Sequence, residues 1–121
     1  MSLLLRGLHA NVTASARSRA DLAWVRVFGC TPIATSEIFS RGQYDLVFNT
    51  IPAPVFTRRV LAQARPGTIL IDLASAPGGI DLEAAGKLPI RTVQALALPG
   101  RVAPKAAGEI IKHTIYHMME E

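Results

Sequence analysis

The sequence predicts an α/β protein built on a doubly wound parallel sheet, with helices on both faces. Predicted strands and helices alternate along the whole chain, which is typical of parallel sheets. Two predicted strands, residues 44–50 and 68–75, are apolar on both faces, as central parallel strands are. In addition, four chemically unusual stretches follow predicted strands, and ligands of such sheets bind at the carboxyl ends of the strands.

The first half of the chain predicts a short helix over residues 1–8 and a strand over 11–15. Ser18 is a plausible N-cap of the next helix, which carries apolar residues at helical spacing and ends at Gly29. A short strand over residues 32–36 and a brief helix follow.

The second half predicts a longer helix at its end, with Pro104 in the first turn. The elements before it are a strand over 44–50, a helix from Pro54 to Pro66, a strand over 68–75, one or two helical turns over 80–87 and a strand over 90–95.

Length and composition restrict the class of protein. The chain has 121 residues, half of them apolar and 18% charged, which fits one globular domain. Its longest apolar runs are too short for a membrane helix, and Arg6 follows too soon for a secretory signal, so a cytoplasmic protein is expected. Cys30 is the only cysteine, which rules out an internal disulfide.

The net charge of +4 comes from scattered basic residues without a basic stripe or aromatic platforms. We therefore expect no nucleic-acid partner, and a small acidic ligand fits the mild positive charge at least as well. No hydrolase arrangement is recognisable. Glu109, His113 and His117 share one face of the last helix, but we interpret them as a solvated surface and expect no metal site.

Three long blocks carry a resemblance to a known family. "YDLVFNTIPAPVF", "LIDLASAPGGIDL" and "LALPGRVAPKAAGEII" together resemble the cofactor-binding half of the A-type subunit of dipicolinate synthase, from about Leu8 to the C-terminus. The resemblance implies an NADP-dependent Rossmann-fold dehydrogenase, distantly similar to the D-2-hydroxyacid dehydrogenases. It further implies oxidation of dihydrodipicolinate to dipicolinate (pyridine-2,6-dicarboxylate) in spore formation, and its implied partner is a flavoprotein-like second subunit.

The sequence departs from that family in one large respect. A Rossmann domain opens with a strand and a G-x-G-x-x-G turn, and this chain contains neither. We therefore expect residues 1–121 to be a partial NAD(P)-binding domain, without its substrate domain and without the central strand of its sheet. Two explanations compete: a truncated, inactive piece of a dehydrogenase, or a binding and assembly module that pairs its bare strand edges with another chain, including a second copy. A 2-hydroxy acid dehydrogenase is a weaker alternative, because no Arg-Glu-His set is found.

The stretch after the first predicted strand favours NADP over NAD. Ser15, Arg17, Ser18 and Arg19 offer hydroxyl and guanidinium donors, and guanidinium suits a ribose 2′-phosphate. The alternative is an N-cap serine beside two solvated arginines.

Asn49, Thr50, Ile51 and Pro52 end a buried strand and are predicted to line the cofactor ribose. In this interpretation Asn49 supplies a hydrogen bond, whereas the alternative is an Asx-type turn that satisfies local backbone groups.

Asp72 lies in a strand that is apolar on both sides, so its carboxylate must be paired or hydrogen-bonded. It either caps a neighbouring helix or lies near the nicotinamide. The small residues after it suggest that something besides the protein's own atoms approaches the backbone, and they are predicted to lie against the nicotinamide end of the cofactor, with a simple tight turn as the alternative. These residues are Ala74, Ser75, Gly78 and Gly79.

The last stretch is predicted to be the meeting point of cofactor and substrate. Leu98, Pro99 and Gly100 form a turn against the cofactor, and Arg101 and Lys105 bring two cations to a helix N-terminus, where a diacid would bind. The alternative is two solvated basic side chains. The sequence identifies no catalytic residue.

Overall fold

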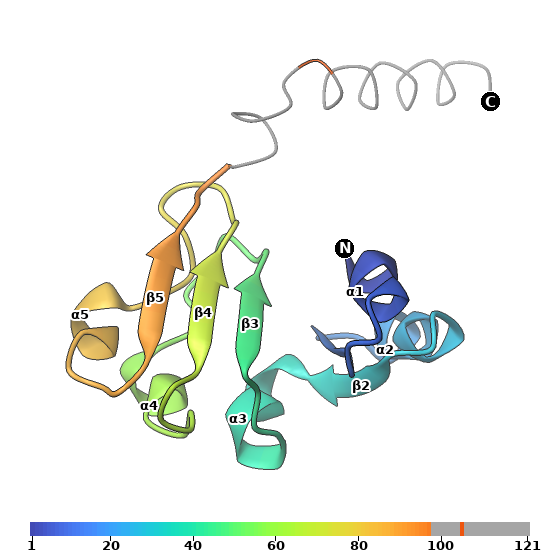
Figure 1. Cartoon of the computed structure of the whole chain (residues 1–121), viewed down its shortest axis with the longest axis horizontal. Helices are drawn as coiled ribbons and strands as arrows, with labels where there is room; N and C mark the ends of the chain where they lie inside the picture. The colour runs from blue at the N-terminus through green and yellow to red at the C-terminus, as the bar shows by residue number, and fades with distance from the viewer. Residues whose placement is uncertain (98–104, 106–121) are drawn as a thin grey trace.

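The computed structural model describes residues 1–97 and Lys105, and within them strands and helices alternate as predicted (Figure 1). In chain order the elements are α1 (Ser2–Gly7), β1 (Thr13–Ala16), α2 (Arg19–Val27), β2 (Thr31–Ala34), the 3-10 turn η1 (Thr35–Glu37), α3 (Ile38–Arg41), β3 (Leu46–Asn49), α4 (Arg58–Leu61), β4 (Ile69–Asp72), α5 (Leu82–Ala85) and β5 (Arg91–Gln94).

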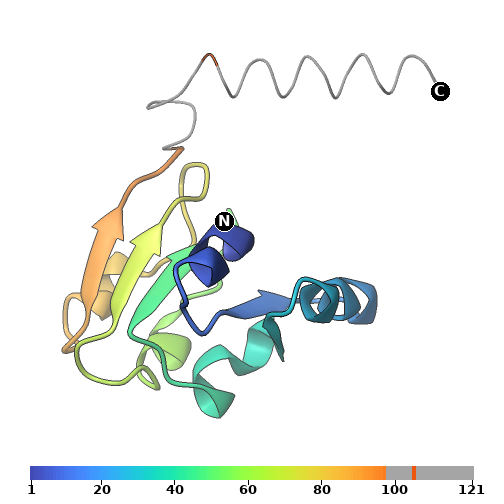
Figure 2. The same cartoon turned by 45° about the vertical axis from the view of Figure 1, so that its right-hand side comes forward.

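The five strands form two separate parallel sheets. One has the order β1-β2 and the other the order β3-β4-β5 (Figures 1 and 2). The order matches a doubly wound sheet whose central strand, between β1 and β3, is missing from these residues. The predicted incomplete Rossmann-like fold is therefore confirmed.

Local sequence signals explain the ends of α2. The Ser18 hydroxyl accepts a hydrogen bond from the backbone N–H of Asp21 at 3.0 Å, which is the predicted N-cap. At the other end Gly29 has a φ of 70°, a left-handed conformation that glycine adopts without strain. Both predicted ends of this helix are confirmed.

The helix predicted to begin near Pro54 begins only at Arg58. Phe56 is held in an extended conformation instead, because its N–H donates to the Gly79 carbonyl at 2.9 Å and its carbonyl accepts from the Asp81 N–H at 3.0 Å. This tertiary pairing of two loops overrides the helical tendency of the local sequence.

The core lies on one face of the β3-β4-β5 sheet. It is formed by Leu70 of β4 with residues of α3, α4, α5 and the loop before α4, and its buried members are Ile38, Phe39, Phe56, Leu61, Leu70, Ala84 and Ala85. On the opposite face Leu46 and Val93 are 44% and 42% exposed. The two-sided burial predicted for β3 is thus not reached within the described residues.

Tyr44 joins the two sheets at the base of β3. Its ring packs against Phe39 with centroids 6.0 Å apart, and its hydroxyl lies near the side chain of Thr13 at the start of β1. Burial raises the pKa of the Tyr44 hydroxyl above 10.0, and the Thr13 contact offsets part of that rise.

This pKa shift predicts a loss of stability at alkaline pH. The folded chain keeps the Tyr44 proton at a pH where the unfolded chain has lost it, so stability is full below the unfolded value of 10.0 and falls as the pH rises above it. Denaturant titrations at pH 8 and at about pH 11 should show a larger stability loss in the wild type than in Tyr44→Phe. Equal losses in both proteins would contradict the prediction.

Candidate functional site

The loops that follow β3 and β4 are locked together by one buried carboxylate. Asp72, the last residue of β4, is 0% exposed and accepts three hydrogen bonds. The donors are the Asn49 Nδ2 at 2.9 Å, the Ala74 N–H at 3.2 Å and the Gly79 N–H at 2.9 Å. Asp72 therefore fixes the end of β3 and both ends of the 74–79 loop to a single point.

These contacts revise the expected roles of Asp72. The helix N-cap nearest in sequence is supplied by Asp81, whose carboxylate accepts from the Ala84 N–H at 2.9 Å. Within the described residues Asp72 anchors the loop and caps no helix. Its proposed position near a nicotinamide stays a prediction.

Asn49 forms the Asx-type turn that the sequence left as the alternative to ligand binding. Its Oδ1 accepts from the Ile51 N–H at 3.1 Å, and its Nδ2 donates to the Ile51 carbonyl at 3.1 Å and to Asp72. Because an amide nitrogen has two hydrogens, both donors of this 2%-exposed side chain are taken inside the chain. Its contribution to a ligand is through the backbone loop that it shapes.

Gly78 and Gly79 are required by the protein's own atoms. A Cβ on Gly78 would lie 2.5 Å from Asp72 Oδ2, and Gly78 has a φ of 87°. A Cβ on Gly79 would lie 2.6 Å from Asn49 Nδ2 and 2.7 Å from the carbonyl oxygen of Ala53. The closure of the two loops already needs these glycines, and their predicted place against the nicotinamide end of a cofactor stays a prediction.

A groove of about 750 Å³ lies between the two sheets. We call it the inter-sheet groove, and it is lined by Met1, Ser2, Leu5, Ala10, Asn11, Val12, Thr13, Ala14, Ser15, Ile33, Ile38, Gln43, Tyr44, Asp45, Leu46, Val47, Phe48, Asn49, Thr50, Ile51, Val55 and Phe56. It brings together Ser15, from the end of β1, with Asn49, Thr50 and Ile51, from the end of β3. Four predicted site residues thus border one groove.

The other predicted residues after β1 lie outside this lining. Arg17 and Arg19 are exposed, and Ser18 is engaged with Asp21, to which its hydroxyl also donates at 2.6 Å. Pro52, Ala74 and Ser75 also lie outside the lining, and Ser75 is exposed. The capping role of Ser18 is confirmed, and a phosphate contact by the arginines stays a prediction.

The Ser18 cap gives a testable stability effect. Ser18→Ala is expected to lower the free energy of unfolding by about 1 kcal/mol, since it removes the acceptor of an otherwise unpaired helix N–H. Thr57→Ala is the matched control, because Thr57 occupies the N-cap of α4 without a side-chain hydrogen bond. Equal effects of the two substitutions in urea titrations would contradict this account.

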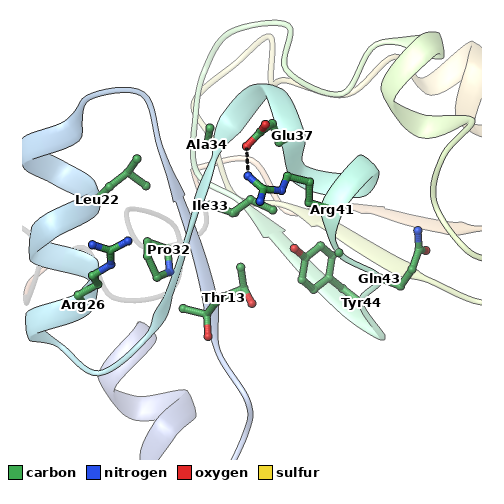
Figure 3. A pocket seen from close by; sticks show the side chains of 12 residues that line it. Thr13, Leu22, Arg26, Pro32, Ile33, Ala34, Glu37, Arg41, Gln43 and Tyr44 are labelled. Atoms are coloured by element: carbon green, nitrogen blue, oxygen red, sulfur yellow. Dashed lines mark hydrogen bonds and ion pairs between the residues drawn. The ribbon is translucent and has the colours of Figure 1, made fainter.

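A second hollow, of about 620 Å³, lies against β2 and contains the ion pair between Glu37 and Arg41 at 3.2 Å (Figure 3). Arg26 and Tyr44 also border it, and none of the predicted site residues does. We therefore place the candidate site at the inter-sheet groove.

The last predicted stretch lies largely outside the described residues. Leu98, Pro99, Gly100 and Arg101 lie outside the described residues, and Lys105 is described alone as an exposed residue. In the described part of the chain no helix is long and apolar enough to cross a membrane.

Comparison with known proteins gives a consistent result. No protein-family model matches the chain. A curated protein, the A-type subunit of dipicolinate synthase from Bacillus subtilis (strain 168), is 40% identical over 115 residues, which are 94% of this chain and 39% of that protein. The predicted resemblance to dipicolinate synthase is confirmed.

Two solved structures of dipicolinate synthase also resemble this chain. The A-type subunit from Bacillus subtilis matches 98% of this chain with a TM-score of 0.82 and 38% identity. The corresponding dipicolinate synthase structure from Bacillus halodurans matches 99% with a TM-score of 0.82 and 37% identity. This chain spans about two fifths of each, 40% and 42% of their lengths.

The walls of the groove also include the backbone edge of Leu46–Phe48 and the segment 10–12, which are not among the predicted site residues. Their side chains alternate as in any strand, so the residues themselves carry no signal of an open edge. Only the strand order of a doubly wound sheet points to them.

Proposed function

We propose that this chain is the cofactor-binding part of an oxidoreductase of the dipicolinate synthase A type. The single observation that carries the proposal is the 40% identity to the Bacillus subtilis dipicolinate synthase protein over 94% of the chain. The geometry supports it, because the ends of β1 and β3 both border the inter-sheet groove, at the strand ends where ligands of such sheets bind.

The reaction that follows from the resemblance is the oxidation of dihydrodipicolinate to dipicolinate in spore formation. NADP⁺ would supply the chemistry by accepting a hydride from the substrate ring, while a proton leaves to a base that the sequence does not identify. The same proposal includes the acidic substrate, a cytoplasmic location, and a partner that is a flavoprotein-like second subunit.

The residues after β1 fit the adenosine end of NADP. Arg17 and Arg19 are exposed guanidinium groups directly beyond the strand, and the nearest carboxylate, Asp21, is engaged with Ser18. An exposed guanidinium binds a phosphate in a two-pronged way, whereas an acidic residue at this place would favour a free 2′-hydroxyl. The 74–79 loop gives less direct support for a cofactor contact, since its glycines already pack against Asp72 and Asn49.

Calorimetric titration of the 121-residue chain with NADP⁺ and NAD⁺ tests the cofactor. We expect tighter binding of NADP⁺, and we expect Arg17→Ala to weaken it on the order of tenfold through the lost charge-assisted contact. Arg59→Ala, an exposed arginine of α4, is the matched control and should bind like the wild type. Equal affinity for both dinucleotides would contradict the NADP assignment.

We also expect little or no dihydrodipicolinate oxidation by the 121-residue chain alone. The sequence contains no G-x-G-x-x-G turn to hold the cofactor pyrophosphate. Absorbance at the NADPH wavelength, followed with the chain and both substrates present, measures this. Robust turnover would show that the expectation is wrong.

A further inference from the structure

Helix α2 carries apolar side chains on its outer face as well as on its inner one. The inner face packs against β1 and β2 and holds Leu22 and Val25, which are half-buried. Three larger apolar residues are exposed instead: Trp24 is 60% exposed, Val27 71% and Phe28 46%. A helix on the surface of a globular protein ordinarily has polar residues on the face away from the core, so this pattern needs a physical explanation.

The exposed apolar residues of α2 form one patch, which we call the outer face of α2. Residues three and four positions apart lie side by side on a helix, and Trp24 stacks on Phe28 with ring centroids 6.0 Å apart. Contiguous exposed apolar patches of this kind mark interaction surfaces. The members of the outer face are Ala20, Ala23, Trp24, Val27 and Phe28.

Arginines border the outer face of α2. Arg19 begins the helix and Arg26 lies in its last turn, and both are exposed. Arg6 of α1 donates to the Phe28 carbonyl at 2.6 Å, which holds a third guanidinium at the end of the helix. Residues 1–29 contain a single acidic side chain, which is already hydrogen-bonded to the N-cap serine. The surroundings of the outer face are therefore positively charged.

The outer face of α2 belongs to neither of the two hollows. Trp24, Val27 and Phe28 are absent from the lining of both. Helix α2 lies at the periphery of the molecule in both views (Figures 1 and 2). The missing centre of the sheet belongs beside β1, whereas the outer face points away from that sheet. An apolar patch at the outside of the molecule, bordered by cations, matches a broad anionic surface better than it matches a small ligand.

We propose that the outer face of α2 docks on the surface of an anionic phospholipid membrane. Trp24, Val27 and Phe28 enter the boundary between headgroups and acyl chains, where aromatic rings are favoured. The bordering arginines lie at the level of the lipid phosphates, which attract them. At nine residues α2 is too short to span a bilayer, so it lies in the plane of the interface. A second copy of the chain is a poorer occupant, because its arginines would meet arginines.

Trp24 supplies the readout of a direct test, because it is the only tryptophan of the chain. The 121-residue chain is titrated, without cofactor, with vesicles of equal parts phosphatidylglycerol and phosphatidylcholine. With these vesicles we expect the Trp24 emission to move to shorter wavelength and the chain to float with the lipid. Binding to vesicles of phosphatidylcholine alone should be on the order of tenfold weaker, and added salt should weaken the binding to anionic vesicles.

Substitutions make the test specific to the outer face of α2. Val27→Asp places a carboxylate within it and should weaken flotation with the anionic vesicles on the order of tenfold. Arg26→Gln removes one bordering cation and should weaken it about fivefold. Leu82→Asp and Arg59→Gln are the matched controls, at an exposed leucine of α5 and an exposed arginine of α4, and should bind like the wild type.

Four results would overturn the proposal. One is an unchanged Trp24 emission with anionic vesicles, when circular dichroism shows that the chain is folded. Equal binding to both kinds of vesicle is another, and a third is Val27→Asp binding as tightly as the wild type. The fourth is an emission shift that grows with protein concentration in the absence of vesicles, which would mean that a second copy covers the outer face. No cofactor is present in these measurements, so failure here is distinct from failure of the proposed function.

Discussion

Replacing Asp72 by alanine is expected to lower the free energy of unfolding by about 3 to 5 kcal/mol, the largest effect of any single polar substitution in the described residues. The carboxylate is 0% exposed and accepts from three donors, two of which are backbone N–H groups of the 74–79 loop. Its removal leaves the two buried backbone N–H groups without this acceptor, and it takes from the Asn49 amide one of its two acceptors, the other being the Ile51 carbonyl. Each such group costs about 1 to 3 kcal/mol.

Urea titration followed by circular dichroism measures the Asp72 effect, with two other aspartates as controls. Asp81→Ala removes only a helix cap and should cost about 1 kcal/mol. Asp45→Ala removes an exposed ion pair with Arg65 and should cost about 1 kcal/mol or less. A loss at Asp72 no larger than the loss at Asp81 would contradict the anchoring role.

Gly79→Ala is expected to cost about 3 kcal/mol for a steric reason. The new Cβ would lie 2.7 Å and 2.8 Å from the carbonyl oxygens of Ala53 and Ile51, so backbone of the neighbouring loop has to move. That movement would also strain the Phe56–Gly79 hydrogen bond, which holds the two loops together. The site loops should therefore loosen along with the loss of stability.

The matched control is Gly7→Ala. No atom lies within 4 Å of a Cβ at Gly7, which is in α1, so this substitution should be neutral or stabilise by up to about 1 kcal/mol. Thermal unfolding of both variants, with hydrogen exchange of the 50–57 segment, measures the difference. Equal melting temperatures for the two variants would contradict the close packing at Gly79.

The alternation of strands and helices was predictable because hydrophobic periodicity is a local property. The N-cap at Ser18 and the helix end at Gly29 are read from residue type alone, since a hydroxyl acceptor and a left-handed backbone are intrinsic to serine and glycine. The missing centre of the sheet followed from comparing the strand sequence with the order of a doubly wound fold. The resemblance to dipicolinate synthase follows from three long sequence blocks that occur in the same order as in that family.

The contacts of the polar residues at the site are harder to predict from the sequence. Asp72 and Asn49 were recognised as buried and polar, but they bind each other across 23 positions of the chain. Residue type and position along the chain indicate local partners and ligands, which for Asp72 are a helix cap or a nicotinamide contact. Helix α4 begins later than predicted for the same reason, a contact between distant segments, because Phe56 pairs with Ile80 in the loop after β4.

By itself, the sequence determined the element types, their order and the family resemblance, because propensity, periodicity and capping depend on residues close together in the chain. Only the tertiary structure decided that the 74–79 loop closes on Asp72 and that its glycines pack against the protein's own atoms. It also decided that two strand edges face one groove. These features depend on distances between segments far apart in the chain, and such distances are set by packing and hydrogen bonding across the whole fold.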